Sequence, residues 1–207
     1  MVTRMTRRFE FLFDFASPNA YLAYRALPPI LARTGATVEI VPCLLGGVFK
    51  ATGNRAPFEA FADIKGKMAY EMLEIRRFVA RHRLAKFRLN PNFPVNSLML
   101  MRGLVAAQAR GEGDAFLEMG LTGMWEEGLK LDDPEVLGRR IAAAGLDAQA
   151  LLAATQSPEV KQRLAEATER AVKRGAFGIP TFFVGDEMFF GKDRLGQVEE
   201  ELLKTDA

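Results

Sequence analysis

The feature that most constrains the fold is a run of alternating phenylalanines near the start of the chain. Every second residue from Phe9 to Phe15 is phenylalanine, and this period of two is typical of a β-strand with one aromatic face. The pattern stops at Ser17 and Pro18. Serine is a favoured helix N-cap, and proline suits the first helical position because its missing N–H leaves no helical hydrogen bond unmade. The chain is therefore predicted to pass from a strand directly into a helix at Ser17.

The segments that follow predict a second strand and then a block of helices. A helix is expected up to Gly35, which suits a C-terminal cap, with a kink or break at Pro28 and Pro29 because each proline ring removes a helical hydrogen bond. The β-branched segment 37–41 predicts the second strand. From 57 to 175 no segment alternates, and the apolar spacing predicts helices. These helices are residues 58–82, 96–110, 114–127, 133–144, 147–154 and 158–175.

Residues 90–96 interrupt the helical block, because prolines and asparagines fill most of this segment and predict a loop. After the block, residues 181–184 and 188–190 predict the two strands of a hairpin, and 194–204 a closing helix. The order is therefore β-α-β, a helical block, then β-β-α. It divides the chain into one α/β domain, made of residues 1–56 and 176–207, and a helical insertion domain, made of residues 57–175.

Composition and charge exclude several functional classes. Lys and Arg number 28 against 26 Asp and Glu, so the net charge is +2 and no strong field for nucleic acid or an anionic membrane is expected. Cys43 is the single cysteine, which excludes an intrachain disulfide, and Cys43 with His82 is too small a ligand set for a structural zinc site. No apolar run reaches the roughly 18 residues of a membrane span, and no signal-peptide core precedes the first strand. We expect no metal, no membrane partner and a cytoplasmic location.

Four short motifs carry a resemblance to a known family. They are FDFASPNAY at 13–21, GN at 53–54, FGIPTF at 177–182 and FGKDR at 190–194. Together they resemble the DsbA-related isomerases that act on 2-hydroxychromene-2-carboxylate, and the kappa-class glutathione transferases. The resemblance covers nearly the whole chain from Phe9 to Leu203. It implies a thioredoxin-like fold with a large all-helical insertion between the β-α-β and β-β-α halves, glutathione as cofactor, and a homodimer.

Ser17 is the candidate catalytic residue. A serine at the start of a helix presents its hydroxyl beside unsatisfied backbone N–H groups and the positive end of the helix dipole, where an anion is favoured. Redox members of this fold place a cysteine pair at the turn, whereas this chain has none there. The resemblance implies that glutathione supplies the sulfur and that Ser17 binds it and donates a hydrogen bond to its thiolate. The alternative is that Ser17 is only a helix cap.

Ile179 and Pro180 are expected to bind the peptide backbone of glutathione. The resemblance implies a cis bond before Pro180, which turns the N–H and C=O of Ile179 outward as an edge that pairs with the cysteinyl backbone. The alternative is an ordinary trans proline at the start of a strand, where a residue without a donor is tolerated.

The turn that contains Phe190, Gly191, Lys192 and Asp193 is implied to bind the γ-glutamyl end of glutathione. Asp193 is either the N-cap of the last helix or a carboxylate that takes the α-amine, and the two roles are compatible. The resemblance places Asn54 near the glycine of glutathione, although Gly-Asn alone is typical of a simple turn.

Three further residues lie in segments that the family places around the electrophile. Lys50, Arg55 and Asn96 each carry a cation or an amide that suits a substrate carboxylate, and each alone is typical of a solvated surface. Cys43 is expected to be a small buried hydrophobe rather than a nucleophile, and Trp125 is expected in the core or a pocket wall.

The function implied by the resemblance is a glutathione-dependent cis/trans isomerase that acts on an aromatic electrophile from a degradation pathway. The thiolate adds to a conjugated carbon, a double bond becomes a rotatable single bond, and elimination follows rotation. Two alternatives stay open. One is a kappa-like glutathione transferase that releases the thioether, and the other is a non-catalytic thioredoxin-like binding module.

Overall fold

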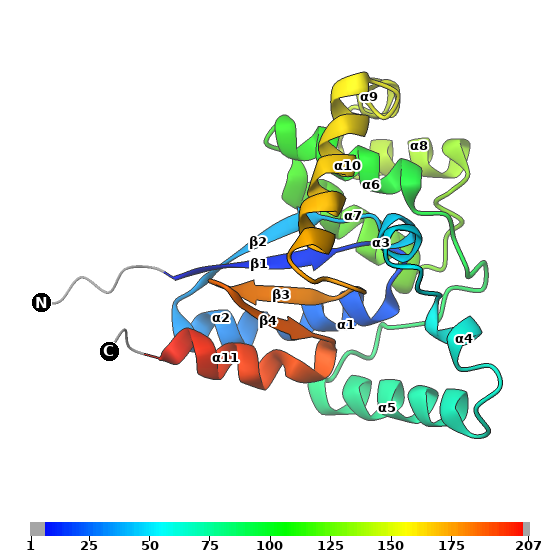
Figure 1. The fold of residues 1–207 in the computed structure, drawn as a ribbon. Helices are drawn as coiled ribbons and strands as arrows, with labels where there is room; N and C mark the ends of the chain where they lie inside the picture. The colour runs from blue at the N-terminus through cyan, green and yellow to red at the C-terminus, as the bar shows by residue number, and fades with distance from the viewer. Residues whose placement is uncertain (1–6, 205–207) are drawn as a thin grey trace, which may run out of the picture.

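The computed structural model describes residues 7–204, and its centre is a four-stranded sheet with the strand order β2-β1-β3-β4 (Figure 1). β1 pairs with β2 in parallel and with β3 in antiparallel orientation, and β3 pairs with β4 as a hairpin. The strands are β1 (Arg8–Phe13), β2 (Thr37–Pro42), β3 (Thr181–Val184) and β4 (Glu187–Phe190). The predicted strands are thus confirmed, although β1 ends two residues earlier than the alternating phenylalanines.

The turn at the end of β1 has the predicted form. Helix α1 (Pro18–Ala26) begins with Ser17 as N-cap, and the Ser17 side chain accepts a hydrogen bond from the N–H of Ala20. The helix breaks at Leu27, and α2 (Pro28–Thr34) follows and ends at Gly35, whose φ of 68° is in the left-handed region. The proline pair therefore breaks the crossover helix into two, as expected.

The helices differ from the sequence-based expectations in two places, one in the helical block and one before it. The helix expected over 58–82 is wrong as a single element, because a short α4 and a longer α5 are separated by residues 61–66, with Gly66 at a φ of 84°. A further helix, α3 (Leu45–Thr52), precedes the block and was not expected. The helices of the block are α4 (Pro57–Ala60), α5 (Lys67–His82), α6 (Leu98–Ala109), α7 (Gly113–Trp125), α8 (Pro134–Ala143), α9 (Ala148–Ala154) and α10 (Pro158–Lys173).

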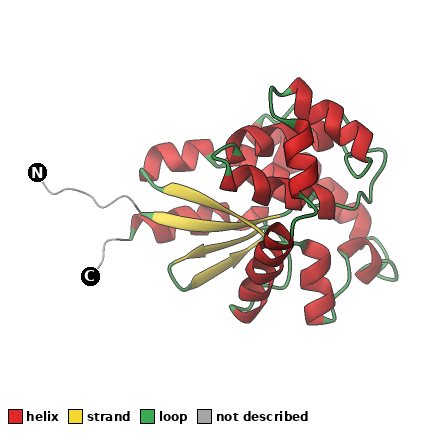
Figure 2. Ribbon diagram, turned by 90° about the horizontal axis from the view of Figure 1, so that it is seen from above, coloured by secondary structure: helices red, strands yellow, loops and turns green. Residues whose placement is uncertain are grey.

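The last strand leads into a short 3-10 turn, η1 (Lys192–Arg194), and then into α11 (Leu195–Leu203). In Figure 1, α6 to α10 lie above the sheet and α2 and α11 lie below it, with α10 packed on β2 and α11 on β3. Arg7 donates to the carbonyl oxygen of Leu202 at 3.2 Å, so β1 begins where α11 ends. Most helices gather toward the end of the sheet away from the two termini (Figure 2). Among residues 7–204, no helix has the length and apolarity needed to cross a bilayer.

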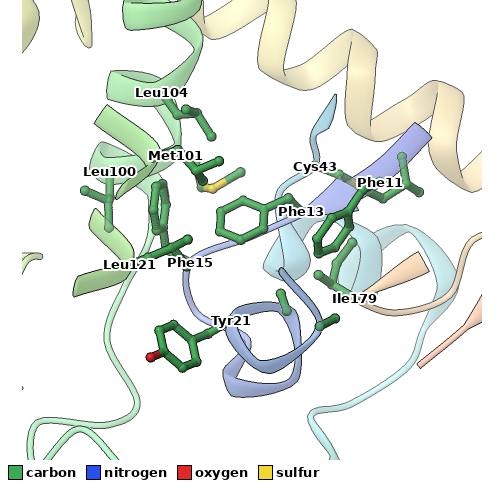
Figure 3. Packing of buried hydrophobic residues seen from close by; sticks show 14 of the residues in the cluster. Phe11, Phe13, Phe15, Tyr21, Cys43, Leu100, Met101, Leu104, Leu121 and Ile179 are labelled. Carbon is green, nitrogen blue, oxygen red and sulfur yellow. The ribbon is translucent and has the colours of Figure 1, made fainter. Parts of the chain in front are cut away.

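Aromatic side chains of β1 form the centre of the core (Figure 3). The rings of Phe13 and Phe15 meet edge to face at 4.9 Å between centroids, and both are fully buried. A Cβ at Gly120 in α7 would lie 2.4 Å from the Phe15 ring, so the absence of a side chain lets α7 approach the end of β1. The opposite face is buried only toward the end of β1, where Leu12 is 1% exposed and Asp14, just after the strand, is 0% exposed. The helical block therefore packs directly on the segment that leads to Ser17.

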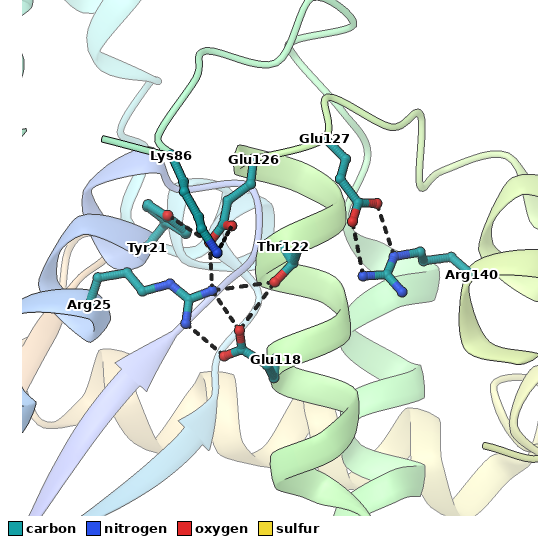
Figure 4. Close-up of polar contacts among 8 residues, drawn as sticks. All are labelled: Tyr21, Arg25, Lys86, Glu118, Thr122, Glu126, Glu127 and Arg140. Carbon is teal, nitrogen blue, oxygen red and sulfur yellow. Dashed lines mark hydrogen bonds and ion pairs between the residues drawn. The ribbon is translucent and has the colours of Figure 1, made fainter. Parts of the chain in front are cut away.

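A cluster of charged side chains joins α1 to α7 (Figure 4). Arg25 donates to both carboxylate oxygens of Glu118, at 2.7 and 2.8 Å, and to Glu126 at 2.8 Å. Tyr21 donates its hydroxyl to Glu126 at 3.0 Å, and burial raises the pKa of Tyr21 to about 12. The Arg25 hydrogen bonds hold the pKa of Glu118 below its usual value. The cluster fixes the helix that begins at Ser17 against the helical block.

Arg25→Met is expected to destabilise the protein more at neutral than at acidic pH. A carboxyl whose folded-state pKa is depressed adds stability above its unfolded pKa and loses it as the pH falls through the folded value. Glu118 is half exposed, so its pair contributes only about 0–1 kcal/mol. Glu126 is 12% exposed, and leaving it without Arg25 adds roughly 1–3 kcal/mol. Urea unfolding of both proteins at pH 7 and near pH 3.5 measures the difference. An equal difference at both pH values would contradict this account.

Candidate active site

Ser17 lies at the contact between the two halves of the sheet domain. Its side chain is buried, with 4% of the residue exposed, and its hydroxyl donates to the carbonyl oxygen of Ile179 at 3.0 Å. The same oxygen accepts the N–H of Ala20 at 3.1 Å. The expected cap is therefore confirmed, and the hydroxyl also has a second partner that a simple cap does not require. The structure brings Ser17 and Ile179 together across 162 positions of sequence.

The segment that follows Ile179 joins the third motif to the fourth. The Ile179–Pro180 bond is cis, as expected, and the carbonyl oxygen of Pro180 accepts the N–H of Gly191 at 2.9 Å. Phe177 and Phe190 are each 42% exposed, and their rings lie 4.4 Å apart. The turn at Gly191 is thus adjacent to the Ile179 segment, and η1 also contacts α1. Ser17, Ile179, Pro180 and the Phe190–Gly191 turn form one continuous region.

Lys192 and Asp193 form an ion pair with an unexpected arrangement. Lys192 is only 4% exposed, and its ammonium donates to the two carboxylate oxygens of Asp193 at 3.1 and 2.9 Å. The ammonium also lies 5.4 Å from the ring centre of Phe78 in α5. Arg194 is the N-cap of α11 and makes no side-chain cap bond, so the interpretation of Asp193 as N-cap is wrong. The Asp193 side chain is 59% exposed and remains accessible to a ligand, whereas the Lys192 side chain is covered.

The remaining candidate residues lie on the surface at the borders of two helices. Lys50 is in the last turn of α3, and Asn54 and Arg55 follow Gly53, the left-handed residue that ends that helix. Asn96 precedes α6, and its side-chain oxygen accepts the N–H of Leu98 at 3.0 Å. The Asn96 amide oxygen therefore caps α6 locally, and its NH₂ group is the part available to a substrate.

Asp14 is a buried carboxylate that sequence reasoning missed. One oxygen accepts the N–H of Ala16 at 2.8 Å and the other accepts the N–H of Leu45 at 2.7 Å. Burial raises the pKa of Asp14, an effect that these two hydrogen bonds and the nearby Ser97 side chain oppose. In the sequence, Asp14 is visible as an acidic residue between a strand and a helix cap. That position alone is also typical of a solvated strand end, so it does not indicate a buried carboxylate.

Two further buried groups are relevant to the candidate site: the thiol of Cys43 and the side-chain oxygen of Asn19. Cys43 is fully buried, and burial raises the pKa of its thiol to about 12, so it is a buried apolar residue as expected and not a nucleophile. Asn19, two residues after Ser17, has a buried amide oxygen that no donor among the described residues reaches.

A groove of about 480 Å³ lies along the outer edge of β2, between that strand and helices α6, α7 and α10. None of the candidate site residues lines it. Its charged lining residues include both signs, for example Arg163, Arg170, Glu39 and Glu166, so it has no strong preference for an anion. The groove is separate from the region around Ser17.

Comparison with known proteins assigns the chain to a family. A model of the DsbA-like thioredoxin domain matches residues 8–203. The chain is 32% identical to a 2-hydroxychromene-2-carboxylate isomerase of Sphingobium xenophagum, over 96% of this chain and 100% of that protein. It is 27% identical to human glutathione S-transferase kappa 1, over 92% and 88% of the two chains. A solved structure of a 2-hydroxychromene-2-carboxylate isomerase is similar with a TM-score of 0.79 and 29% identity, covering 93% of both chains. The chain therefore belongs to the DsbA-like thioredoxin family, among the relatives of 2-hydroxychromene-2-carboxylate isomerases and kappa-class glutathione transferases.

Proposed function

We propose that this protein is a glutathione-dependent cis/trans isomerase of the 2-hydroxychromene-2-carboxylate isomerase type. The names of its relatives support an isomerase or transferase that acts on a small molecule. The observation that carries the proposal is the placement of Ser17, whose hydroxyl lies at the N-terminus of α1 and against the carbonyl of Ile179. A hydroxyl donor at the positive end of a helix favours an anionic sulfur, and the chain has no cysteine pair there to provide one.

The residues of this region fit glutathione. Ser17 offers a hydroxyl donor and Asn19 a buried oxygen that lacks a donor. Ile179 and Pro180 would hold the cysteinyl part, and the exposed carboxylate of Asp193 would take the α-amine of the γ-glutamyl part. Asn54 would contact the glycine end, and the turn of Phe190 and Gly191 would cover the γ-glutamyl part.

The chemistry that glutathione supplies when bound is a thiolate that adds reversibly to the conjugated carbon of an enone and so makes a double bond rotatable. Ser17 turns its hydroxyl from the Ile179 carbonyl toward the sulfur and donates a charge-assisted hydrogen bond. This rotation frees the Ile179 carbonyl to accept a peptide N–H. Lys50, Arg55 and the NH₂ group of Asn96 bind and orient the substrate carboxylate.

Kappa-like transferase activity is a second candidate, supported by the relatives named glutathione S-transferase kappa. It uses the same residues, and the products separate the two reactions, because the transferase consumes glutathione and the isomerase returns it.

A cytoplasmic location and a homodimer stay predictions that rest on the sequence and the resemblance. Light scattering measures the mass of the assembly.

Glutathione is expected to raise the melting temperature of the protein. A ligand that binds only the native state adds about 2.7 kcal/mol to stability at a hundredfold excess over its dissociation constant. A thermal-shift titration measures this effect. The matched ligand is the tripeptide whose cysteinyl residue is replaced by 2-aminobutyryl, which keeps the backbone and lacks the sulfur. It should bind more weakly than glutathione at a pH where the thiol is ionised in the site. No shift with millimolar glutathione would contradict the proposal and favour a non-catalytic module.

A further inference from the structure

We propose that Asp14 is a positioning residue that holds the electrophile-binding segments to the turn that carries Ser17. The inference rests on the proposed function, because it assigns the substrate end of that site to α3 and to the start of α6. Asp14 does not touch a substrate in this proposal. It acts through the segments that its carboxylate joins.

Three segments of the chain meet at this carboxylate. The N–H of Ala16 bonds to one oxygen at 2.8 Å, which shapes the turn before Ser17, and the backbone N–H of Ser17 bonds to the carbonyl of Asp14 at 3.1 Å. The N–H of Leu45, the first residue of α3, bonds to the other oxygen at 2.7 Å. Ser97, at the start of α6, lies close enough to this carboxylate to lower the pKa of Asp14. Asp14 thus links Ser17 to the helix that carries Lys50 and to the segment that carries Asn96.

Neither of the two helices is capped at its start in the usual way. α3 begins after Leu44, which has no side-chain acceptor, so the Asp14 carboxylate serves as a cap from a distant part of the chain. Ser97 stands at the N-cap position of α6 but makes no side-chain cap bond, and it lies beside the Asp14 carboxylate instead. The Asp14 carboxylate therefore lies at the starts of both helices, where it adds to the local contacts of Thr168 and Asn96.

The chemistry of the two backbone donors requires a carboxylate at position 14. One N–H group donates to each oxygen, and an ionised carboxylate offers acceptors only. An asparagine of the same size would turn an NH₂ group toward one of these donors. Burial of the Asp14 carboxylate among neutral groups disfavours its charged form. A position that served only to fill the core would therefore be better occupied by an apolar residue.

Two variants test the proposal, alongside one control variant. Ser97→Ala removes only the link to α6, and Asp14→Asn disturbs all three links. Asp147→Asn is the control, because Asp147 caps the distant helix α9 with one bond of 3.0 Å to Ala150. The measurements are the dissociation constant of glutathione, the kcat and KM for 2-hydroxychromene-2-carboxylate, and amide hydrogen exchange at residues 16, 45 and 97–101.

We expect Ser97→Ala to raise the KM for 2-hydroxychromene-2-carboxylate about fivefold or more while the glutathione dissociation constant stays within about twofold. Asp14→Asn should lower kcat/KM about tenfold to a hundredfold, the range for one lost hydrogen bond to a charged group, and should speed exchange at the Leu45 amide. Asp147→Asn should change neither constant. A KM for Ser97→Ala equal to that of the wild type would overturn the proposal, as would unchanged exchange at Leu45 in Asp14→Asn. Amide exchange can be measured without glutathione. If the wild type fails to bind glutathione, the proposed function is overturned. The exchange data still decide whether Asp14 holds α3.

Discussion

Ser17→Ala is expected to lower the ionised fraction of bound glutathione about tenfold to a hundredfold at neutral pH, while the fold survives. A hydrogen bond to a charged group contributes roughly 1.5–3 kcal/mol, which corresponds to a rise of about one to two units in the pKa of the bound thiol. The cap bond to Ala20 is lost as well, at a cost of about 0.5–2 kcal/mol of folding stability. Titration of the thiolate absorbance of glutathione bound to both proteins measures the pKa.

The matched control for this experiment is Ser157→Ala. Ser157 caps α10 through the same kind of bond, because the N–H of Val160 donates to its hydroxyl oxygen at 3.2 Å. This variant should show a similar loss of stability with an unchanged thiol pKa. If Ser17→Ala also leaves the pKa unchanged, Ser17 is a cap only and has no part in the mechanism.

Trp125→Ala is expected to reduce the free energy of unfolding by about 3–5 kcal/mol. Trp125 is fully buried, its indole N–H donates to the carbonyl of Phe15 at 3.0 Å, and its ring lies 6.2 Å from that of Phe87 and 6.1 Å from that of Phe93. Total stabilities of about 5–15 kcal/mol are typical, so this single change removes a large share. Urea unfolding followed by circular dichroism measures it, since Trp125 is the sole tryptophan.

Trp125→Phe separates the two contributions of this side chain. The phenyl ring keeps most of the packing but leaves the buried carbonyl of Phe15 without its donor, which costs about 1–3 kcal/mol. The ordering wild type, then Trp125→Phe, then Trp125→Ala is therefore expected. A loss below about 1 kcal/mol in Trp125→Ala would show that α7 does not support the turn before Ser17.

The parts of the fold that were predictable depend on local chemistry. Ser17 with Pro18 specifies a helix start, Pro28 breaks the crossover, and Gly35 ends it, because each effect acts within one turn of chain. The hairpin and the break before α6 follow from short-range turn signals in the same way. The cis bond at Pro180 came from the family resemblance, because base rates favour trans.

The parts that were missed depend on contacts from distant segments. Helix α3 contains Gly46 and Gly47 and has no cap of its own, so its local propensity is weak, and the N–H groups of Leu44 and Leu45 are satisfied by Thr168 and Asp14. Residues 61–66 have the apolar content of a helix, yet Gly66 adopts a left-handed conformation and begins a new one.

The candidate site shows the same division. Ser17 and the Ile179 segment could be predicted because motif and helix chemistry agree, whereas nothing near Lys192 indicates that α5 covers its ammonium with Phe78. Asp14 is buried because it directly follows β1, an inner strand of the sheet whose last residues are buried on both faces. A period of two in the sequence identifies a strand but does not tell an inner strand from an edge strand.

The position of β1 also sets an order of events during protein synthesis. β2 leaves the ribosome soon after β1, but β3 follows only after the entire helical block. Until then one edge of β1 has no strand partner, and Phe11 lacks the ring of Phe182, which lies 4.7 Å away in the folded protein. An unpaired, aromatic strand edge is a template for association between chains, so a nascent chain of this protein is most vulnerable while its insertion is being translated. Ile179, the hydrogen-bond partner of Ser17, arrives in the same late segment, so one step closes the sheet and completes the site.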